Sequence, residues 1–146
     1  MIKKIVLAFI LTFSISAVTF SQESDYIQIE KTLHYYLDGN LIDDFEIIKK
    51  AFHANATMKS VSSKTGDYRE YNALEVFKNA KKRETPKPNI TSRVSYINIF
   101  GSAASAKLET NLPRATVVDY MHLLKIDGKW QIVSKIYSVK LKEKIK

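Results

Sequence analysis

The hydrophobic pattern in the first half of the chain predicts helices. Between residues 25 and 37 the apolar side chains recur every three or four positions, as on one face of a helix. They are Tyr26, Ile29, Leu33, Tyr36 and Leu37. Gly39 is expected to end this helix, and Asp43 followed by Glu46 resembles the capping box that begins a second one. The first two helices would then form a hairpin, and Asn72 would begin a third helix.

In the second half, alternating apolar and polar residues predict antiparallel strands. Two dipeptides, Gly101-Ser102 and Asp127-Gly128, are typical of two-residue turns, so each is expected to join a β-hairpin. The expected strands cover residues 56–62, 68–71, 91–100, 103–112, 116–126 and 129–139. Helices followed by a meander of strands indicate an α+β fold of one domain.

The register of each hairpin sorts its side chains into two faces. The two-residue turn of the second hairpin places Asp119 opposite Ile136, and the same count in the first hairpin places Ser95 opposite Leu108. One face of the second hairpin is mostly apolar and is expected to pack on the helices: Asp119, Met121, Leu123, Trp130, Ile132, Ser134 and Ile136. The other face is half apolar, so we expect another surface to cover it: Tyr120, His122, Leu124, Gln131, Val133, Lys135 and Tyr137.

Composition places the chain among soluble globular proteins. It has 146 residues, of which 45% are hydrophobic and 26% are charged. It contains no cysteine, which excludes disulfides, thiolate metal ligands and a thiol nucleophile. The formal net charge is +8, but the basic residues gather at 78–87 and 140–146, away from the aromatic side chains, which argues against nucleic acid binding. His34, His53 and His122 lack a metal-ligand spacing, so neither a metal nor a cofactor is expected.

Residues 1–21 resemble a secretory signal. Lys3 and Lys4 precede an apolar stretch, and small residues precede a cleavage point after Ser21. The mature domain would be 22–146, exported to the periplasm or secreted, with no stable membrane span once the signal is removed. An uncleaved N-terminal anchor is the alternative, because the uncharged stretch is close to the lower length limit for a bilayer span.

Several stretches resemble one protein family. They are residues 36–39 (YLDG), 51–56 (AFHANA), 101–107 (GSAASAK) and 119–133 (DYMHLLKIDGKWQIV). The element order is similar to the nuclear transport factor 2-like cone, and the stretches resemble its exported "putative lumazine-binding" branch. The resemblance covers nearly all of the mature chain, and the last stretch is the most specific. It implies a curved sheet wrapped around helices, a pocket at the open end, a pteridine-like ligand and frequent dimers.

The wider superfamily includes ketosteroid isomerase-like and SnoaL-like enzymes, which use a pocket Asp or His as a general base. The resemblance therefore makes Asp119 the candidate base, with Tyr36 or Tyr71 donating to a developing oxyanion. The expected ligand pocket is lined by Tyr36, His53, Tyr71, Asp119, Met121 and Trp130. The same residues also fit structural roles, with His53 capping the second helix, the aromatic side chains in the core, and Asp119 bonded to backbone or to an arginine. The candidate arginines are Arg69, Arg93 and Arg114.

Three functions of different classes fit the sequence. The leading hypothesis is a non-catalytic exported protein that binds a small molecule in a conical pocket. The second is an isomerase, dehydratase or cyclase with Asp119 as general base. The third is an interaction module, a homodimer formed through the outer face of the sheet around a filled interior. A cavity beside Asp119 would support one of the first two functions, and a filled interior there would favour the third.

Overall fold

The computed structural model describes residues 23–143. The helices are α1 (Asp25–Leu41), α2 (Phe45–Ile48) and α3 (Ala73–Lys78). The strands are β1 (Phe52–Val61), β2 (Tyr68–Asn72), β3 (Thr91–Phe100), β4 (Ala103–Leu112), β5 (Ala115–Ile126) and β6 (Lys129–Leu141). The predicted α+β fold is confirmed, although β1 begins earlier than expected. The proposed signal, residues 1–21, lies outside the described residues.

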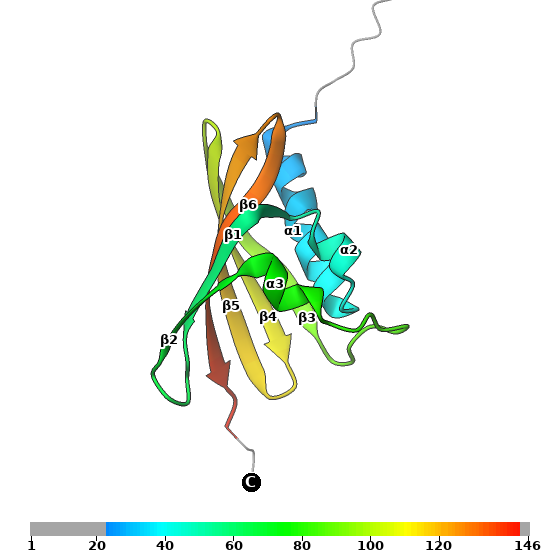
Figure 1. Ribbon diagram of the computed structural model, residues 1–146, viewed down its shortest axis with the longest axis vertical. Coiled ribbons are helices and arrows are strands. Elements are labelled where there is room, and N and C mark those ends of the chain that lie inside the picture. The colour runs from blue at the N-terminus through cyan, green and yellow to red at the C-terminus, as the bar shows by residue number, and fades with distance from the viewer. Residues whose placement is uncertain (1–22, 144–146) are drawn as a thin grey trace, which may run out of the picture.

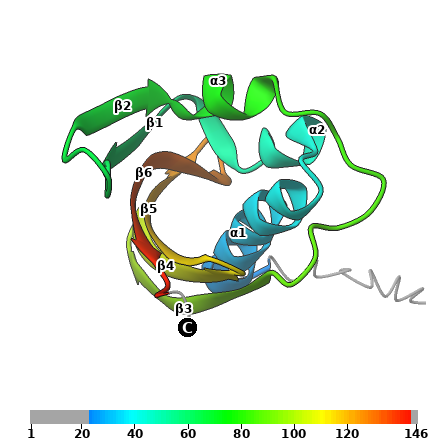
Figure 2. The same ribbon diagram turned by 90° about the horizontal axis from the view of Figure 1, so that it is seen from below.

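The strands form one sheet in the order β2-β1-β6-β5-β4-β3. Neighbouring strands are antiparallel except for β1 and β6, which run parallel. The sheet curves around α1, and α2 and α3 lie beside α1 on the concave side (Figures 1 and 2). A curved, unclosed sheet with helices in its hollow is the cone that the resemblance implied.

The helix α1 continues past the position where the sequence predicted its end. Gly39 lies inside the helix and is buried, so the predicted stop at Gly39 is wrong. A Cβ atom at this position would lie 2.6 Å from Ile48 Cγ1 and 2.9 Å from Ile48 N. The glycine is therefore needed for the close approach of α2. Asp44 rather than Asp43 caps α2, because its Oδ1 accepts a hydrogen bond from the Glu46 N–H at 3.0 Å.

Two β-bulges shift the registers that regular hairpins would have. In β3, Val94 rather than Ser95 lies opposite Leu108. In β6, Val133 is an extra residue with no counterpart in β5. Because side chains alternate between faces, one inserted residue moves every later side chain of β6 to the other side of the sheet.

The bulge in β6 corrects the predicted assignment of faces. Asp119 pairs with Tyr137, not with Ile136. Lys135, expected on the outer face, is buried on the concave face, and Tyr137 is partly buried there. Ile136, expected in the core, is 44% exposed.

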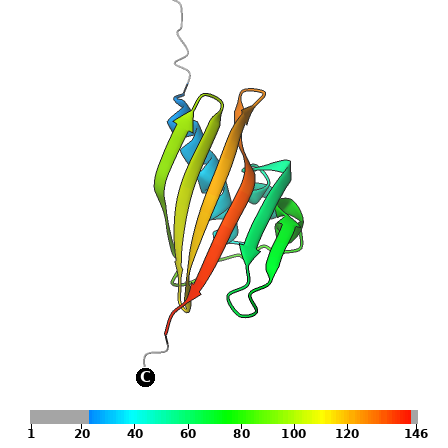
Figure 3. The ribbon, with the colours of Figure 1, turned by 90° about the vertical axis from the view of Figure 1, so that its left-hand side faces the viewer.

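Figure 3 shows the convex face of the sheet, which is turned away from the helices. This face carries exposed apolar side chains. Tyr120 and Leu124 are among them, as the sequence predicted, together with Phe100 at the β3–β4 turn. Among residues 23–143, no helix combines the length and the apolar character that crossing a bilayer requires.

Candidate functional site

Asp119 lies in the core in contact with two other polar side chains. Lys135 Nζ is 2.9 Å from Asp119 Oδ1, and the Tyr36 hydroxyl donates a hydrogen bond to Asp119 Oδ2 at 3.1 Å. Lys135 Nζ also donates to the Tyr36 hydroxyl oxygen at 2.7 Å. The exposed fractions are 2% for Asp119 and 4% for each of the other two. We call Tyr36, Asp119 and Lys135 the ionic cluster.

Aromatic rings surround the ionic cluster. The bulge in β6 turns Lys135 inward, where its Nζ lies 4.8 Å from the ring centroid of Tyr36 and 4.7 Å from that of Tyr137. The Tyr36 ring packs edge-on against Phe52 and Phe77, with centroids 5.7 and 5.9 Å away. The ammonium is therefore held by two π faces as well as by the carboxylate.

The electrostatics of the cluster keep Tyr36 protonated. Burial raises the pKa of the Tyr36 hydroxyl well above its ordinary value of 10.0, and the nearby negative charge of Asp119 raises it further. Asp119 Oδ1 accepts no aligned hydrogen bond within the described residues, so Lys135 compensates it mainly by charge. The predicted arginine partner is wrong, because the cation is Lys135. The arginines considered were Arg69, Arg93 and Arg114.

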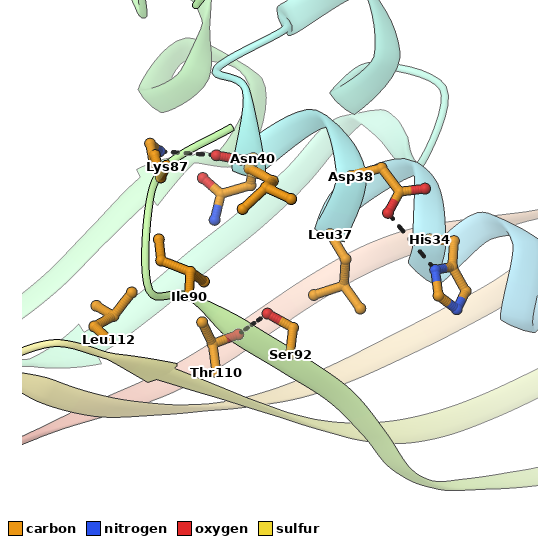
Figure 4. Close-up of a pocket in the computed structure, with 10 residues that line it drawn as sticks. His34, Leu37, Asp38, Asn40, Lys87, Ile90, Ser92, Thr110 and Leu112 are labelled. Atoms are coloured by element: carbon orange, nitrogen blue, oxygen red, sulfur yellow. Dashed lines mark hydrogen bonds and ion pairs between the residues drawn. The ribbon is translucent and has the colours of Figure 1, made fainter. Parts of the chain in front are cut away.

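A cavity of about 490 Å³ opens between the C-terminal half of α1 and the ends of β3 and β4 (Figure 4). Leu37, Leu41, Ile90 and Leu112 give it apolar walls, and His34, Asp38, Asn40 and Lys87 add polar and charged groups to its lining. Ser92 Oγ and Thr110 Oγ1, which also line it, lie 2.9 Å apart, and either can be the donor. Apolar walls with a few polar groups are typical of small-molecule sites, whose volumes run from roughly 300 to 1,000 Å³. We call this space the α1–β4 cavity.

Lys87 fastens the connector between α3 and β3 to the end of α1, and so fixes one wall of the α1–β4 cavity. Its Nζ donates to the Asn40 carbonyl oxygen at 2.8 Å and to Asp43 Oδ1 at 2.6 Å. Its backbone N–H donates to the Leu41 carbonyl oxygen at 3.0 Å. The wall is therefore held by both side-chain and backbone contacts.

The α1–β4 cavity lies beside the ionic cluster on the concave face, two residues further along β4. Leu108 pairs with Asp119, and Thr110, two positions further along β4, pairs with Val117. Leu37 follows Tyr36 in α1. No member of the ionic cluster lines the cavity.

The residues predicted to line one pocket are spread over several places. Tyr36 and Asp119 meet in the ionic cluster, and Met121 is fully buried in the same core. Trp130 is also buried, but it lies at the other end of α1, where its Nε1 donates to Asp25 Oδ1 at 2.9 Å. None of these four lines the α1–β4 cavity.

His53 and Tyr71 lie on the strands that flank the body of the sheet. His53 is in β1, well past the end of α2, so its predicted role as a helix cap is wrong. Its Nδ1 accepts a hydrogen bond from the Asn55 N–H at 3.2 Å. Tyr71 is 46% exposed on β2.

Sequence reasoning missed two groups of residues. Lys135 was missed because the bulge that turns it inward leaves no mark in the alternation. Thr110 could have been found, because a regular strand at 103–112 already puts it on the same face as Leu108. Ser92 follows from Thr110, its cross-strand partner.

Comparison with known proteins assigns the chain to a family. The family model described as "Putative lumazine-binding" matches residues 24–138. The chain belongs to this family. No curated protein matches it significantly.

Solved structures share the fold of this family member. An NTF2-like protein of unknown function from Shewanella baltica superposes with a TM-score of 0.70 at 28% identity, covering 82% of this chain and 98% of that one. One from Methylobacillus flagellatus gives 0.67 at 26% identity, covering 82% and 96%. A ketosteroid isomerase-like protein from Erwinia carotovora gives 0.61 at 14% identity, covering 81% and 98%. The chain is thus NTF2-like in fold.

Proposed function

We propose that this protein binds a small organic molecule in the α1–β4 cavity and does not transform it. The single observation that carries the proposal is the cavity itself, about 490 Å³ in volume, with apolar walls, a pair of hydroxyl groups and further polar side chains from α1 and Lys87. Apolar walls provide affinity for a ring system, and the two hydroxyl groups can meet its polar edge. A flat heterocycle of the pteridine kind fits this description, and the family's description points to the same class.

The geometry of Asp119 favours binding over catalysis. A general base must reach the proton it removes, directly or through one water. Asp119 Oδ2 already accepts from Tyr36, Oδ1 faces Lys135, and the side chain does not line the cavity. The enzyme hypothesis requires that the ionic cluster separate when substrate enters, whereas the binding hypothesis requires no such change.

Fluorescence titration with lumazine and riboflavin tests the proposal. Ser92→Leu puts an apolar branch into the cavity, and Ser95→Leu makes the same change at an exposed position of the same strand that does not line it. We expect Ser92→Leu to weaken binding about tenfold or more and Ser95→Leu to leave it unchanged. Equal affinity in both variants would place the ligand elsewhere. A pteridine turned over by the wild-type protein would favour the enzyme.

We also propose export and self-association, which the structure leaves as expectations. N-terminal sequencing of protein from its native cell tests export, with Gln22 expected as the first residue. An intact Met1 in the membrane fraction would support the uncleaved anchor instead.

A further inference from the structure

We infer that the protein has a second binding site, for a small organic anion with an apolar body. The site is a cavity of about 390 Å³ between the β1–β2 hairpin and the last residues of β6. In Figure 3 the hairpin lies beside the end of β6, at the end of the sheet where the C-terminus leaves it. The site shares no lining residue with the α1–β4 cavity, so it does not depend on the function proposed above.

Two cations and no carboxylate line this second cavity. Arg69 pairs in register with Ser60, which is buried, so both side chains point to the concave face. Lys64 comes from the β1–β2 turn. Within the described residues neither cation forms an ion pair, whereas Lys59, on the opposite face of the same hairpin, lies 3.2 Å from Glu70 Oε1. Two uncompensated cations facing one space attract an anion.

Hydroxyl groups add donors to the same space. Ser60 is 9% exposed, and Ser62 and Ser63 line the same cavity beside it. The turn itself is fixed, because the Ser62 N–H donates to the Asp67 carbonyl oxygen and the Gly66 N–H donates to the Ser62 carbonyl oxygen, both at 2.9 Å. The Asp67 carboxylate accepts from the Thr65 hydroxyl and does not line the cavity.

The remaining walls select the body of the ligand. They are apolar and aromatic, from Val61, Tyr137, Val139 and Leu141. An inorganic anion would leave these walls without a partner, whereas an alkyl or aryl group would pack on them. The chemistry therefore specifies a carboxylate or phosphate monoester head carried on an apolar chain or ring.

The test uses octanoate and octyl phosphate as probes, with octanol and inorganic phosphate as comparisons, in a two-dimensional amide NMR titration. We expect both amphiphilic anions to shift amides of the 62–67 turn, and to bind at least tenfold tighter than octanol or phosphate. The two anions distinguish a carboxylate from a phosphate preference. Failure of all four probes to shift this turn at millimolar concentration would overturn the inference.

Matched variants separate the site from general charge. Arg69→Gln should weaken octanoate binding about tenfold, the loss expected when a charge-assisted hydrogen bond is removed, and Arg69→Lys should restore part of it. Arg114→Gln removes the same charge at the same end of the sheet, from a residue that does not line the cavity, and should leave binding unchanged. Equal weakening by both glutamine variants would mean that net charge alone attracts the probe, and the site would be rejected. Binding that survives Arg69→Gln but is lost in Ser92→Leu would assign the probe to the α1–β4 cavity instead.

Discussion

Replacing Lys135 by methionine should destabilise the protein by about 3–5 kcal/mol, the usual cost of removing one partner of a buried ion pair. Methionine keeps most of the side-chain volume and removes the ammonium group. The Asp119 carboxylate would then remain in a core where it is 2% exposed, with only the Tyr36 hydroxyl as a donor. The loss would be a large fraction of the 5–15 kcal/mol that stabilises a typical domain.

The distances in the ionic cluster account for this magnitude. Opposite charges 2.9 Å apart attract by roughly 6 kcal/mol at an effective dielectric constant of about 20. In the native protein that attraction offsets the cost of taking both Asp119 and Lys135 out of water. Without Lys135, the carboxylate still bears its desolvation cost but has lost the attraction.

Urea unfolding followed by the fluorescence of Trp130, the single tryptophan of the chain, measures the effect. Lys59→Met is the matched control, because Lys59 pairs with Glu70 across β1 and β2, with side chains 35% and 44% exposed. We expect less than about 1 kcal/mol for this exposed pair. If Lys135→Met costs no more than Lys59→Met, the reasoning about burial is refuted.

A triple variant checks the mechanism rather than the size of the loss. Tyr36→Phe, Asp119→Leu and Lys135→Met together replace the ionic cluster by apolar groups of similar volume. Because no polar group is then left unpaired, the triple variant should recover most of the stability lost by Lys135→Met alone. A triple variant no more stable than the single one would mean that packing, not charge, determines the loss.

Three further outcomes are expected. The free energy of unfolding should fall as pH rises above about 10, because the unfolded chain releases the Tyr36 proton there while the folded protein keeps it. Tyr36→Phe should reduce the slope of this free energy against pH, measured by urea unfolding, by up to about 1.4 kcal/mol per pH unit. Gly39→Ala should destabilise the protein by about 1–3 kcal/mol in the same assay, despite the better helix propensity of alanine, because the new Cβ would meet Ile48 Cγ1 at 2.6 Å; an unchanged midpoint would contradict this. If the convex face joins two copies, Leu124→Lys with Val133→Lys should give folded monomers by light scattering, and a monomeric wild-type protein at high concentration would end that proposal.

The hairpins could be predicted from the sequence because their turns are local. Asp127 and Gly128 both adopt positive φ, 49° and 77°, which a type I′ turn requires and which few other residue pairs accept. The first hairpin follows from Gly101, at φ 57°, because the other common two-residue turn needs a glycine at its first position only. Alternation on both sides of these turns then predicts the strands. The cone follows from the resemblance together with this order of elements.

The ionic cluster could not be predicted, because its geometry depends on contacts between distant residues. The bulge at Val133 turns Lys135 to the concave face, where its ammonium forms an ion pair with Asp119. A count of residues from the turn cannot detect this bulge. Gly39 shows the same limit. Its sequence context is that of a helix end. Only the position of Ile48 in space shows that the glycine allows α2 to pack closely against α1.

The parallel pairing of β1 with β6 has a consequence for how the chain acquires its structure. Thr57 pairs with Ser134, and the Ile132 N–H donates to the Ala51 carbonyl oxygen at 2.8 Å, so β1, which follows the first two helices, docks onto β6, which is synthesised much later. Loop closure over most of the chain must precede this contact, which makes late, slow assembly the expected order of events. Until β6 arrives, β1 lacks the neighbour that ties it to the rest of the sheet. A chain that stops short of residue 129 would therefore leave its N-terminal half without a sheet to fold against, and β6 decides whether that half becomes native.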